Sequence, residues 1–244
     1  MRNAECGMPP SRKLGAFGKV QGVGTMLVRD RMTPNPITVT TETSLKDALD
    51  LVRSKPFRHL PVVDQNGKLV GIVTEKSLVY ASPTPTTTLS VFEVDYILSH
   101  TKVGQIIQGP VITVGPDFPI EEAARKMVDH RIGCLPVVEG DALGTARLIG
   151  IISDTDIFRV FVEGLGGGHP STRITVRVAE EVGSLARVTV RVAELGGNIY
   201  SLGMFWGEKP KDRLVVFRLE GVDRESVVQA LEADGIQVVH VWGP

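Results

Sequence analysis

An internal repeat is the feature that most restricts the folds open to this chain. Ile37-Thr38-Val39 recurs 75 positions later as Ile112-Thr113-Val114, and Leu60-Pro61-Val62-Val63 recurs at the same offset as Leu135-Pro136-Val137-Val138. One offset shared by two separate motifs indicates a duplicated structural unit. Because a unit of this size buries its apolar face best against a copy of itself, we expect the two copies to pack together.

A third pair of motifs extends the repeat. Gly71-Ile72-Val73-Thr74 matches Gly150-Ile151-Ile152-Ser153 at an offset of 79, so the second copy carries four extra residues, around 141–146. These residues fall in a predicted hairpin loop, where extra length costs little. Between the first two motifs, both copies have apolar residues at helical spacing: Leu45, Ala48, Leu49 and Val52 in one, and Ile120, Ala123, Ala124 and Met127 in the other. Each copy therefore predicts the order strand, helix, strand, strand, helix.

A hydroxyl and a carboxylate lie where the last strand of the second copy gives way to a helix. The apolar run from Arg147 to Ile152 predicts a buried strand, and Ser153 is a candidate N-cap. Asp156 lies on the same side of the first helical turn. Such a pair, beside unpaired backbone N–H groups, can hold a ribose or a phosphate. The alternative is a helix cap with acidic first-turn residues and no ligand.

The three motifs together resemble a known family. A Thr-Val segment, then hydrophobic-Pro-Val-Val, then Gly-hydrophobic-hydrophobic-Thr/Ser-x-x-Asp is similar to the pattern of tandem CBS domains, also called a Bateman module. The resemblance covers residues 26–163. It implies two βαββα repeats packed with pseudo-two-fold symmetry, a regulatory role, and adenosine-containing ligands in the clefts between the repeats.

The resemblance implies a ligand site in the second repeat. In the family, the Thr/Ser and Asp of the last motif hold ribose and phosphate, while the early Thr segment and the residues before Pro-Val-Val surround the base. The matching residues are Thr113, Cys134, Leu135, Pro136, Ser153 and Asp156. In the first repeat Thr38 and Thr74 match, but Ser77 stands in place of the Asp. Since a hydroxyl is a weaker partner than a carboxylate, adenosine binding in the first repeat stays open.

Two basic residues precede the Pro-Val-Val motif of the first repeat. Arg58 and His59 occupy the positions that Gly133 and Cys134 occupy in the second repeat. The resemblance implies that basic residues here meet phosphates near the central axis. Arg58 and His59 are therefore candidates to reach a nucleotide held by the other repeat. The alternative is a solvated arginine and a packing histidine.

Composition narrows the class of function. The 244 residues are 42% hydrophobic with a net charge of −1, which suits about two globular domains and gives no bulk attraction to nucleic acid or an anionic membrane. Cys6 and Cys134 lack partners at metal-ligand spacing, which favours a reducing cytoplasm and no metal site. No apolar run is long enough to span a bilayer. The five histidines are scattered along the sequence, and it contains no Gly-x-Ser-x-Gly or P-loop motif. We therefore expect no catalytic residue and no catalytic cofactor.

Composition also divides the chain. We expect a disordered arm over residues 1–25, with translation starting at Met26 as an alternative. The repeats then span 26–82 and 102–163, separated by a linker and connecting helix over 83–101, where two prolines disfavour regular structure. A glycine-rich linker over 164–171 precedes the last unit, residues 172–243.

The last unit has a pattern of its own. The pattern predicts a ferredoxin-like βαββαβ sandwich. It consists of strand alternation after Arg173, an apolar helical stripe from Leu185, two further strands, a helix capped by Asp223 and a final strand. Gly183-Ser184-Leu185 and Gly196-Gly197-Asn198-Ile199 resemble landmarks of ACT domains, although Val182 stands where that family usually has proline. The resemblance makes Gly183, Ser184, Leu185 and Asn198 candidates to hold an amino acid. Many ACT-like domains only dimerise, so that alternative stays open.

The order of two CBS repeats and one ACT domain is similar to that of bacterial acetoin-utilisation accessory proteins. The resemblance implies a mixed α+β and α/β chain that forms a cytoplasmic homodimer and senses AMP, ADP, ATP or S-adenosylmethionine. Its protein partner is unknown. Two alternatives stay open: a structural dimerisation adaptor with no small-molecule ligand, and a regulatory subunit or relative of a nucleotide-metabolism enzyme.

Overall fold

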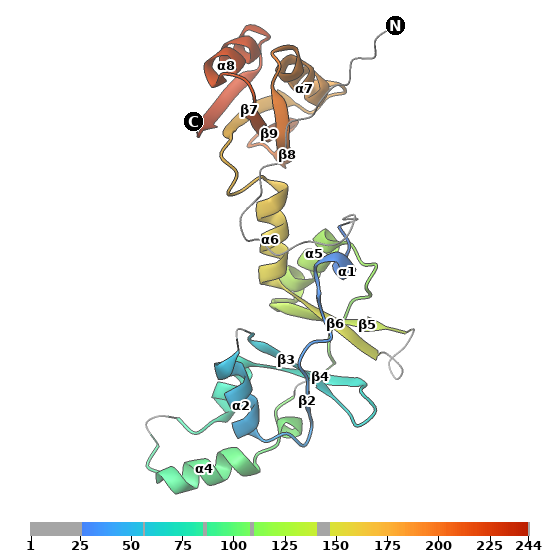
Figure 1. The fold of residues 1–244 in the computed structure, drawn as a ribbon, viewed down its shortest axis with the longest axis vertical. Coiled ribbons are helices and arrows are strands. Elements are labelled where there is room, and N and C mark those ends of the chain that lie inside the picture. Colours follow the sequence, from blue (N-terminus) through green and yellow to red (C-terminus); the bar gives the residue numbers. More distant parts are fainter. Residues whose placement is uncertain (1–25, 56, 85–86, 108–109, 141–146, 244) are drawn as a thin grey trace, which may run out of the picture.

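The computed structural model describes residues 26–55, 57–84, 87–107, 110–140 and 147–243. The predictions for the arm over 1–25, for Cys6 and for the loop insertion at 141–146 lie outside these residues. Figure 1 shows three sheets in succession, with the C-terminal unit at one end and the first repeat at the other. No helix in the described ranges is long and apolar enough to cross a membrane.

The first repeat has the predicted order strand, helix, strand, strand, helix. Its sheet places β3 in the middle, parallel to β2 and antiparallel to β4. The apolar stripe of its first helix, Leu45, Ala48, Leu49 and Val52, is buried against that sheet. The elements are β2 (Val39–Thr40), α2 (Leu45–Ser54), β3 (His59–Val63), β4 (Leu69–Thr74) and α3 (Glu75–Ala81).

The second repeat follows the same plan with a shorter first strand. The predicted strand around Thr113 is reduced to one parallel bridge between Val114 and Val137. Pro116 follows two residues later and has no N–H with which to extend the pairing. The remaining elements are α5 (Ile120–His130), β5 (Cys134–Glu139), β6 (Arg147–Ser153) and α6 (Asp154–Gly164).

The segment that leads into each repeat packs with the other repeat. The short helix α1 (Val28–Arg31) and strand β1 (Thr33–Pro34) precede the first repeat, but β1 pairs with β6 and Val28 is buried in the core of the second repeat. The 3₁₀ turn η1 (Val103–Gln105) precedes the second repeat, and Val103 is buried in the core of the first. The repeats are thus interlocked, because each core contains the segment that leads into the other repeat. Domain boundaries drawn in chain order do not describe this exchange of segments.

A glycine in each third motif makes room for these crossing segments. A Cβ on Gly71 would lie 2.7 Å from Ile107 Cγ2, and a Cβ on Gly150 would meet the Met32 side chain and lie 3.2 Å from the Thr33 carbonyl oxygen. Met32 and Ile107 are themselves 75 positions apart. The close approach of backbone to side chain is therefore duplicated, and it explains the glycine of the motif.

The connecting helix α4 (Val91–His100) packs beside α2 at the far end of the first repeat (Figure 1). Ser90 caps it through a capping box with Glu93, and Lys46 Nζ pairs with Asp95 Oδ1 at 2.6 Å. No residue of α4 is fully buried.

The C-terminal unit has the predicted order βαββαβ. Its four-stranded sheet has the order β10-β7-β9-β8, with every pair antiparallel. One core lies between this sheet and the two helices, with Phe217 fully buried at its centre. The elements are β7 (Thr172–Ala179), α7 (Ser184–Glu194), β8 (Asn198–Trp206), β9 (Asp212–Glu220), α8 (Arg224–Ala233) and β10 (Gln237–Trp242).

Candidate functional site

Ser153 and Asp156 form a capping box at the start of α6. The Ser153 N–H and hydroxyl donate to Asp156 Oδ2 at 2.9 and 2.6 Å, and the Asp156 N–H donates back to Ser153 Oγ at 3.4 Å. The predicted cap is therefore confirmed. It uses one carboxylate oxygen, and the other, Oδ1, accepts from Arg159, whose side chain is 71% exposed.

This arrangement leaves part of Asp156 open to a further partner. An ionised carboxylate has about four lone-pair sites, and the cap occupies those of one oxygen. An exposed arginine pair such as that with Arg159 is worth little and is easily exchanged. Asp156 Oδ1 can therefore accept a hydroxyl from a ligand without breaking the cap.

The other candidates of the second repeat adjoin this cap through the strand register. Cys134 lies opposite Ser153 in the β5–β6 pair. The Val114 N–H donates to the Pro136 carbonyl, which brings Thr113 beside Pro136. Leu135 is fully buried in the core of the repeat, so its side chain contributes packing. The structure thus gathers five of the six predicted positions around the start of β5 and the end of β6.

Cys134 is a buried, unreactive thiol. Burial, with the nearby Asp154 carboxylate acting in the same direction, raises its pKa to about 12. The thiolate is the reactive form of cysteine, so Cys134 stays protonated at neutral pH.

In the first repeat, the side-chain hydroxyls of the corresponding cap form hydrogen bonds within the cap itself. The Thr74 N–H donates to Ser77 Oγ at 2.8 Å, and the Ser77 hydroxyl donates to the Thr74 carbonyl oxygen at 2.9 Å. Thr74 lies opposite His59 in the β3–β4 pair, and Thr38 is exposed just before β2. With Ser77 in place of an aspartate, the position equivalent to Asp156 offers a ligand no charged oxygen.

His59 crosses from the first repeat to the second. A Cβ placed on Gly133 would lie 3.4 Å from His59 Nε2 and 3.3 Å from Asp154 Oδ2, so the three groups meet. Burial lowers the pKa of His59, while Asp154 opposes that shift. Arg58 is exposed, and its carbonyl accepts from the Glu75 N–H. The structure therefore brings one of the two basic candidates to the cap of the other repeat.

Gly133 and Asp154 are the residues that sequence reasoning missed. Gly133 stands where the first repeat has Arg58, and its missing side chain leaves the space that His59 fills. That substitution between equivalent positions is the signal that could have identified the contact.

The candidates of the C-terminal unit fall into two groups. Gly183 is the N-cap of α7 with φ of 89°, and Ser184 begins the helix. Asn198 begins β8, which follows the C-terminal end of the same helix, and it pairs with Glu220 of β9. A helix of this length spans about 16 Å, so one chain does not bring Asn198 to Gly183. Leu185 packs on the core.

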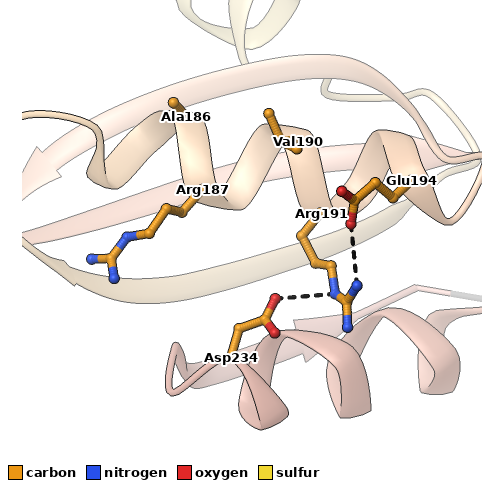
Figure 2. A pocket seen from close by; sticks show the side chains of 6 residues that line it. All are labelled: Ala186, Arg187, Val190, Arg191, Glu194 and Asp234. Atoms are coloured by element: carbon orange, nitrogen blue, oxygen red, sulfur yellow. Dashed lines mark hydrogen bonds and ion pairs between the residues drawn. The ribbon is translucent and has the colours of Figure 1, made fainter.

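A surface depression on α7 is lined by none of these residues (Figure 2). Ala186, Arg187, Val190, Arg191, Glu194 and Asp234 line it. Arg191 pairs with Glu194 at 3.1 Å and with Asp234 at 3.0 Å, so the charges of this depression satisfy one another. Within the described residues, no group of three or more His, Cys, Asp or Glu side chains could hold a metal ion.

Comparison with known proteins places the two repeats. The model of the family described as CBS domain matches residues 28–83 and 103–163. An uncharacterised protein of Methanocaldococcus jannaschii, MJ1426, is 31% identical, over 56% of this chain and 92% of its own length. The chain spans only about a quarter of the first curated relatives, such as inosine-5'-monophosphate dehydrogenase of Nitrosopumilus maritimus, which is 30% identical over 57% of this chain and 24% of its own.

Solved structures show the same coverage. A putative acetoin utilization protein (AcuB) from Vibrio cholerae is 32% identical, over 56% of this chain and 90% of that one, with a TM-score of 0.45. The CBS domain pair of protein MJ0100, in complex with 5-methylthioadenosine and S-adenosyl-L-methionine, is 30% identical, over 56% and 96%, also with a TM-score of 0.45. Since the family model matches both repeats and the chain spans nearly all of MJ1426 at 31% identity, the chain belongs to the CBS-domain family.

Proposed function

We propose that the protein is a non-catalytic regulator whose second repeat binds an adenosine-containing ligand of the class of AMP, ADP, ATP or S-adenosylmethionine. The observation that carries this proposal is the meeting of both repeats at one helix start. His59 of the first repeat lies against Gly133 and Asp154, next to the Ser153–Asp156 cap of the second. A ligand held there touches both repeats.

Each group has a role suited to its chemistry. Asp156 Oδ1 accepts a ribose hydroxyl, and a hydrogen bond to a charged acceptor is the strong kind. The segment at Thr113 and Pro136 flanks the base, and His59 approaches from the other repeat. A ligand that contacts both repeats favours one arrangement of them over another, and this difference in affinity is what regulation requires.

Native mass spectrometry of gently purified protein, followed by calorimetric titration with the four compounds, tests the proposal. These compounds share adenosine and differ in charge at the 5′ end, so their ranking identifies the signal. A chain that carries or binds one of them is a sensor. A dimer that binds none favours the dimerisation adaptor, and the proposal fails.

A second candidate function concerns the C-terminal unit. The Ser184 side chain is 4% exposed, and its Oγ has no hydrogen-bond partner among the described residues. A buried hydroxyl without a partner is costly, which favours a ligand or partner group at the start of α7. We assign this unit as an ACT domain that takes an amino acid there. Thermal shift with the twenty amino acids tests this, with Ser184→Ala expected to abolish any response.

The remaining assignments concern cellular context. A cytoplasmic homodimer in a bacterial acetoin-utilisation setting, acting on a protein partner, agrees with the order of the three units. Affinity capture from cells grown with and without acetoin, using Asp156→Asn as a matched bait, tests the partner and the pathway together. Capture of the same partner with and without acetoin would contradict a role in acetoin utilisation.

A further inference from the structure

The linker of residues 164–171 is packed on the C-terminal sheet. Its glycine content predicts flexibility, yet the Gly166 N–H donates to the Glu163 carbonyl at 2.9 Å and the Gly167 N–H donates to the Val162 carbonyl at 2.7 Å. Ser171 is 4% exposed. The segment therefore continues the end of α6 as an ordered turn.

A buried arginine of the sheet holds this turn. Arg218 on β9 is 8% exposed, and no carboxylate in the described part of the chain lies within ion-pair distance of it. Its Nε donates to the Leu165 carbonyl at 3.1 Å, and the terminal nitrogen Nη1 lies 3.4 Å from the carbonyls of His169 and Ser171. A buried cation requires such acceptors, so the linker backbone and Arg218 depend on each other.

Two further contacts fix the same turn. The His169 ring stacks on Tyr200 with centroids 4.0 Å apart, and its Nδ1 lies 3.0 Å from Glu220 Oε1. Gly166 has φ of 66°, and a Cβ there would lie 2.7 Å from Ser201 Oγ. Only glycine fits this position, because both the backbone conformation and the space exclude a side chain.

Helix α6 therefore has one end in each unit. Its first turn carries the Ser153–Asp156 cap, and Leu165, its C-cap, accepts from Arg218. A cation at a helix C-terminus is favourable for the helix dipole. Arg31 of α1 also holds Glu163 near the end of the helix, at 2.7 Å. Figure 1 shows α6 leading directly from the second repeat to the C-terminal sheet.

We infer that Arg218 fixes the linker to the C-terminal sheet, so that α6 and the C-terminal unit move as one body. A ligand at the first turn of α6 then displaces the C-terminal unit through the helix, with no flexible joint between. The coupling half of this inference rests on the proposed function, while the rigid junction does not.

Hydrogen exchange of the ligand-free protein tests the junction. The amides of Gly166 and Gly167 should exchange at least about tenfold more slowly than those of an unstructured peptide. Arg218→Met keeps the length of the side chain and removes the donors, and it should return these amides toward the unstructured rate. Arg177→Met is the matched control, since Arg177 lies in the same sheet and pairs with Asp212. Fast exchange in the wild type, or equal effects of the two substitutions, would overturn the rigid junction.

Tryptophan fluorescence tests the coupling. Both tryptophans, Trp206 and Trp242, lie in the C-terminal unit, and the Arg218 guanidinium lies 5.4 Å from the centre of the Trp242 ring. Saturating the second repeat with its adenosine ligand should change the emission in wild type and Arg177→Met, and not in Arg218→Met, at equal calorimetric affinity. If calorimetry shows binding to the wild type and the emission does not change, the coupling is wrong. Absence of binding to every compound instead removes the proposed function and its coupling, and the exchange data still decide the junction.

Discussion

Ser77 and Asp156 occupy equivalent positions in two similar helix caps, and their chemistry decides what each cap leaves for a ligand. The Ser77 hydroxyl both accepts from and donates to the Thr74 backbone. Asp156 makes the same cap with one oxygen and keeps a second oxygen toward the exposed Arg159. The two repeats are therefore alike in structure and differ in the acceptor that each cap leaves for a ligand.

Substituting Asp156 separates the cap from the ligand contact. Asp156→Asn keeps an oxygen for the Ser153 N–H, so stability should change by less than about 1 kcal/mol. The charged hydrogen bond to ligand is lost, which should weaken adenosine binding by about 1.5–3 kcal/mol, or roughly ten- to a hundredfold. Calorimetry measures the affinity and urea unfolding measures the stability. Unchanged affinity would place the site elsewhere.

His59 should make stability depend on pH. Its pKa is lowered from the ordinary value of 6.5 by burial, with Asp154 opposing and Arg58 assisting the shift. The unfolded chain then binds the proton more readily than the folded chain. Stability is full above pH 6.5 and falls as the pH drops from there toward the folded pKa, by at most about 1.4 kcal/mol per pH unit.

Urea unfolding between about pH 7.5 and pH 5 measures this loss. His59→Gln should flatten the slope in that window. His240→Gln, at an exposed position of β10, is the matched control and should keep the wild-type slope. An identical slope in wild type and His59→Gln would show that His59 is not the titrating group.

At the scale of elements, the crossing segments determine how the repeats interlock. Gly71 faces Ile107, a β-branched side chain with little freedom, whereas Gly150 faces the flexible Met32. Gly71→Ala should therefore cost about 1–3 kcal/mol of unfolding free energy. Gly150→Ala should cost less, because the thioether can move aside and the Thr33 carbonyl oxygen, 3.2 Å away, needs to shift only slightly.

Urea unfolding of the two alanine variants provides the comparison. Neither glycine has a left-handed φ, so the alanine backbone is tolerated at both positions and the contact alone is tested. The double variant Gly71→Ala with Ile107→Ala should cost less than the sum of the two single variants, since Ile107→Ala removes the contacting atoms. Equal costs at Gly71 and Gly150 would contradict the packing described.

Periodicity predicted most of the elements because it reports local burial. The helical stripe at Leu45 and the strand alternation after Arg173 both correspond to observed elements. The exchange of leading segments was not predictable, because Val28 is apolar in either arrangement and only long-range packing decides which core it joins. The ordered conformation of the glycine-rich turn was likewise not predictable, because it depends on Arg218, some 50 residues later in the chain.

The candidate site was predictable where one motif supplied it. Ser153 and Asp156 are neighbours on one turn, so their spacing sufficed to place the cap. The approach of His59 to Asp154 joins two repeats. The exchange of Arg58 for Gly133 between equivalent positions signals the space above Gly133, but it does not say that His59 fills it. Gly183 and Asn198 resembled one site in the sequence, while the strand order separates them by the length of α7.

At the scale of the whole molecule, the apolar side chains on α4 form a candidate surface for the predicted homodimer. Val91, Phe92 and Tyr96 are 82%, 86% and 63% exposed, on a helix with no fully buried residue. Exposed apolar side chains gathered on one helix are typical of interaction surfaces. Helix α4 lies at the end of the molecule remote from the C-terminal unit (Figure 1), so pairing through α4 leaves that unit free.

The predicted homodimer should therefore depend on α4. Native mass spectrometry and sedimentation should show a dimer for the wild type and a shift to monomer for Phe92→Glu, because a buried unpaired carboxylate opposes association. Val182→Glu is the matched control: it introduces the same charge at a fully exposed apolar position of the C-terminal unit and should leave the dimer intact. A Phe92→Glu dimer as tight as the wild type would move the interface elsewhere, and a monomeric wild type would remove the dimer. Since the ligand cap lies on α6, Phe92→Glu should retain calorimetric affinity, which separates assembly from sensing.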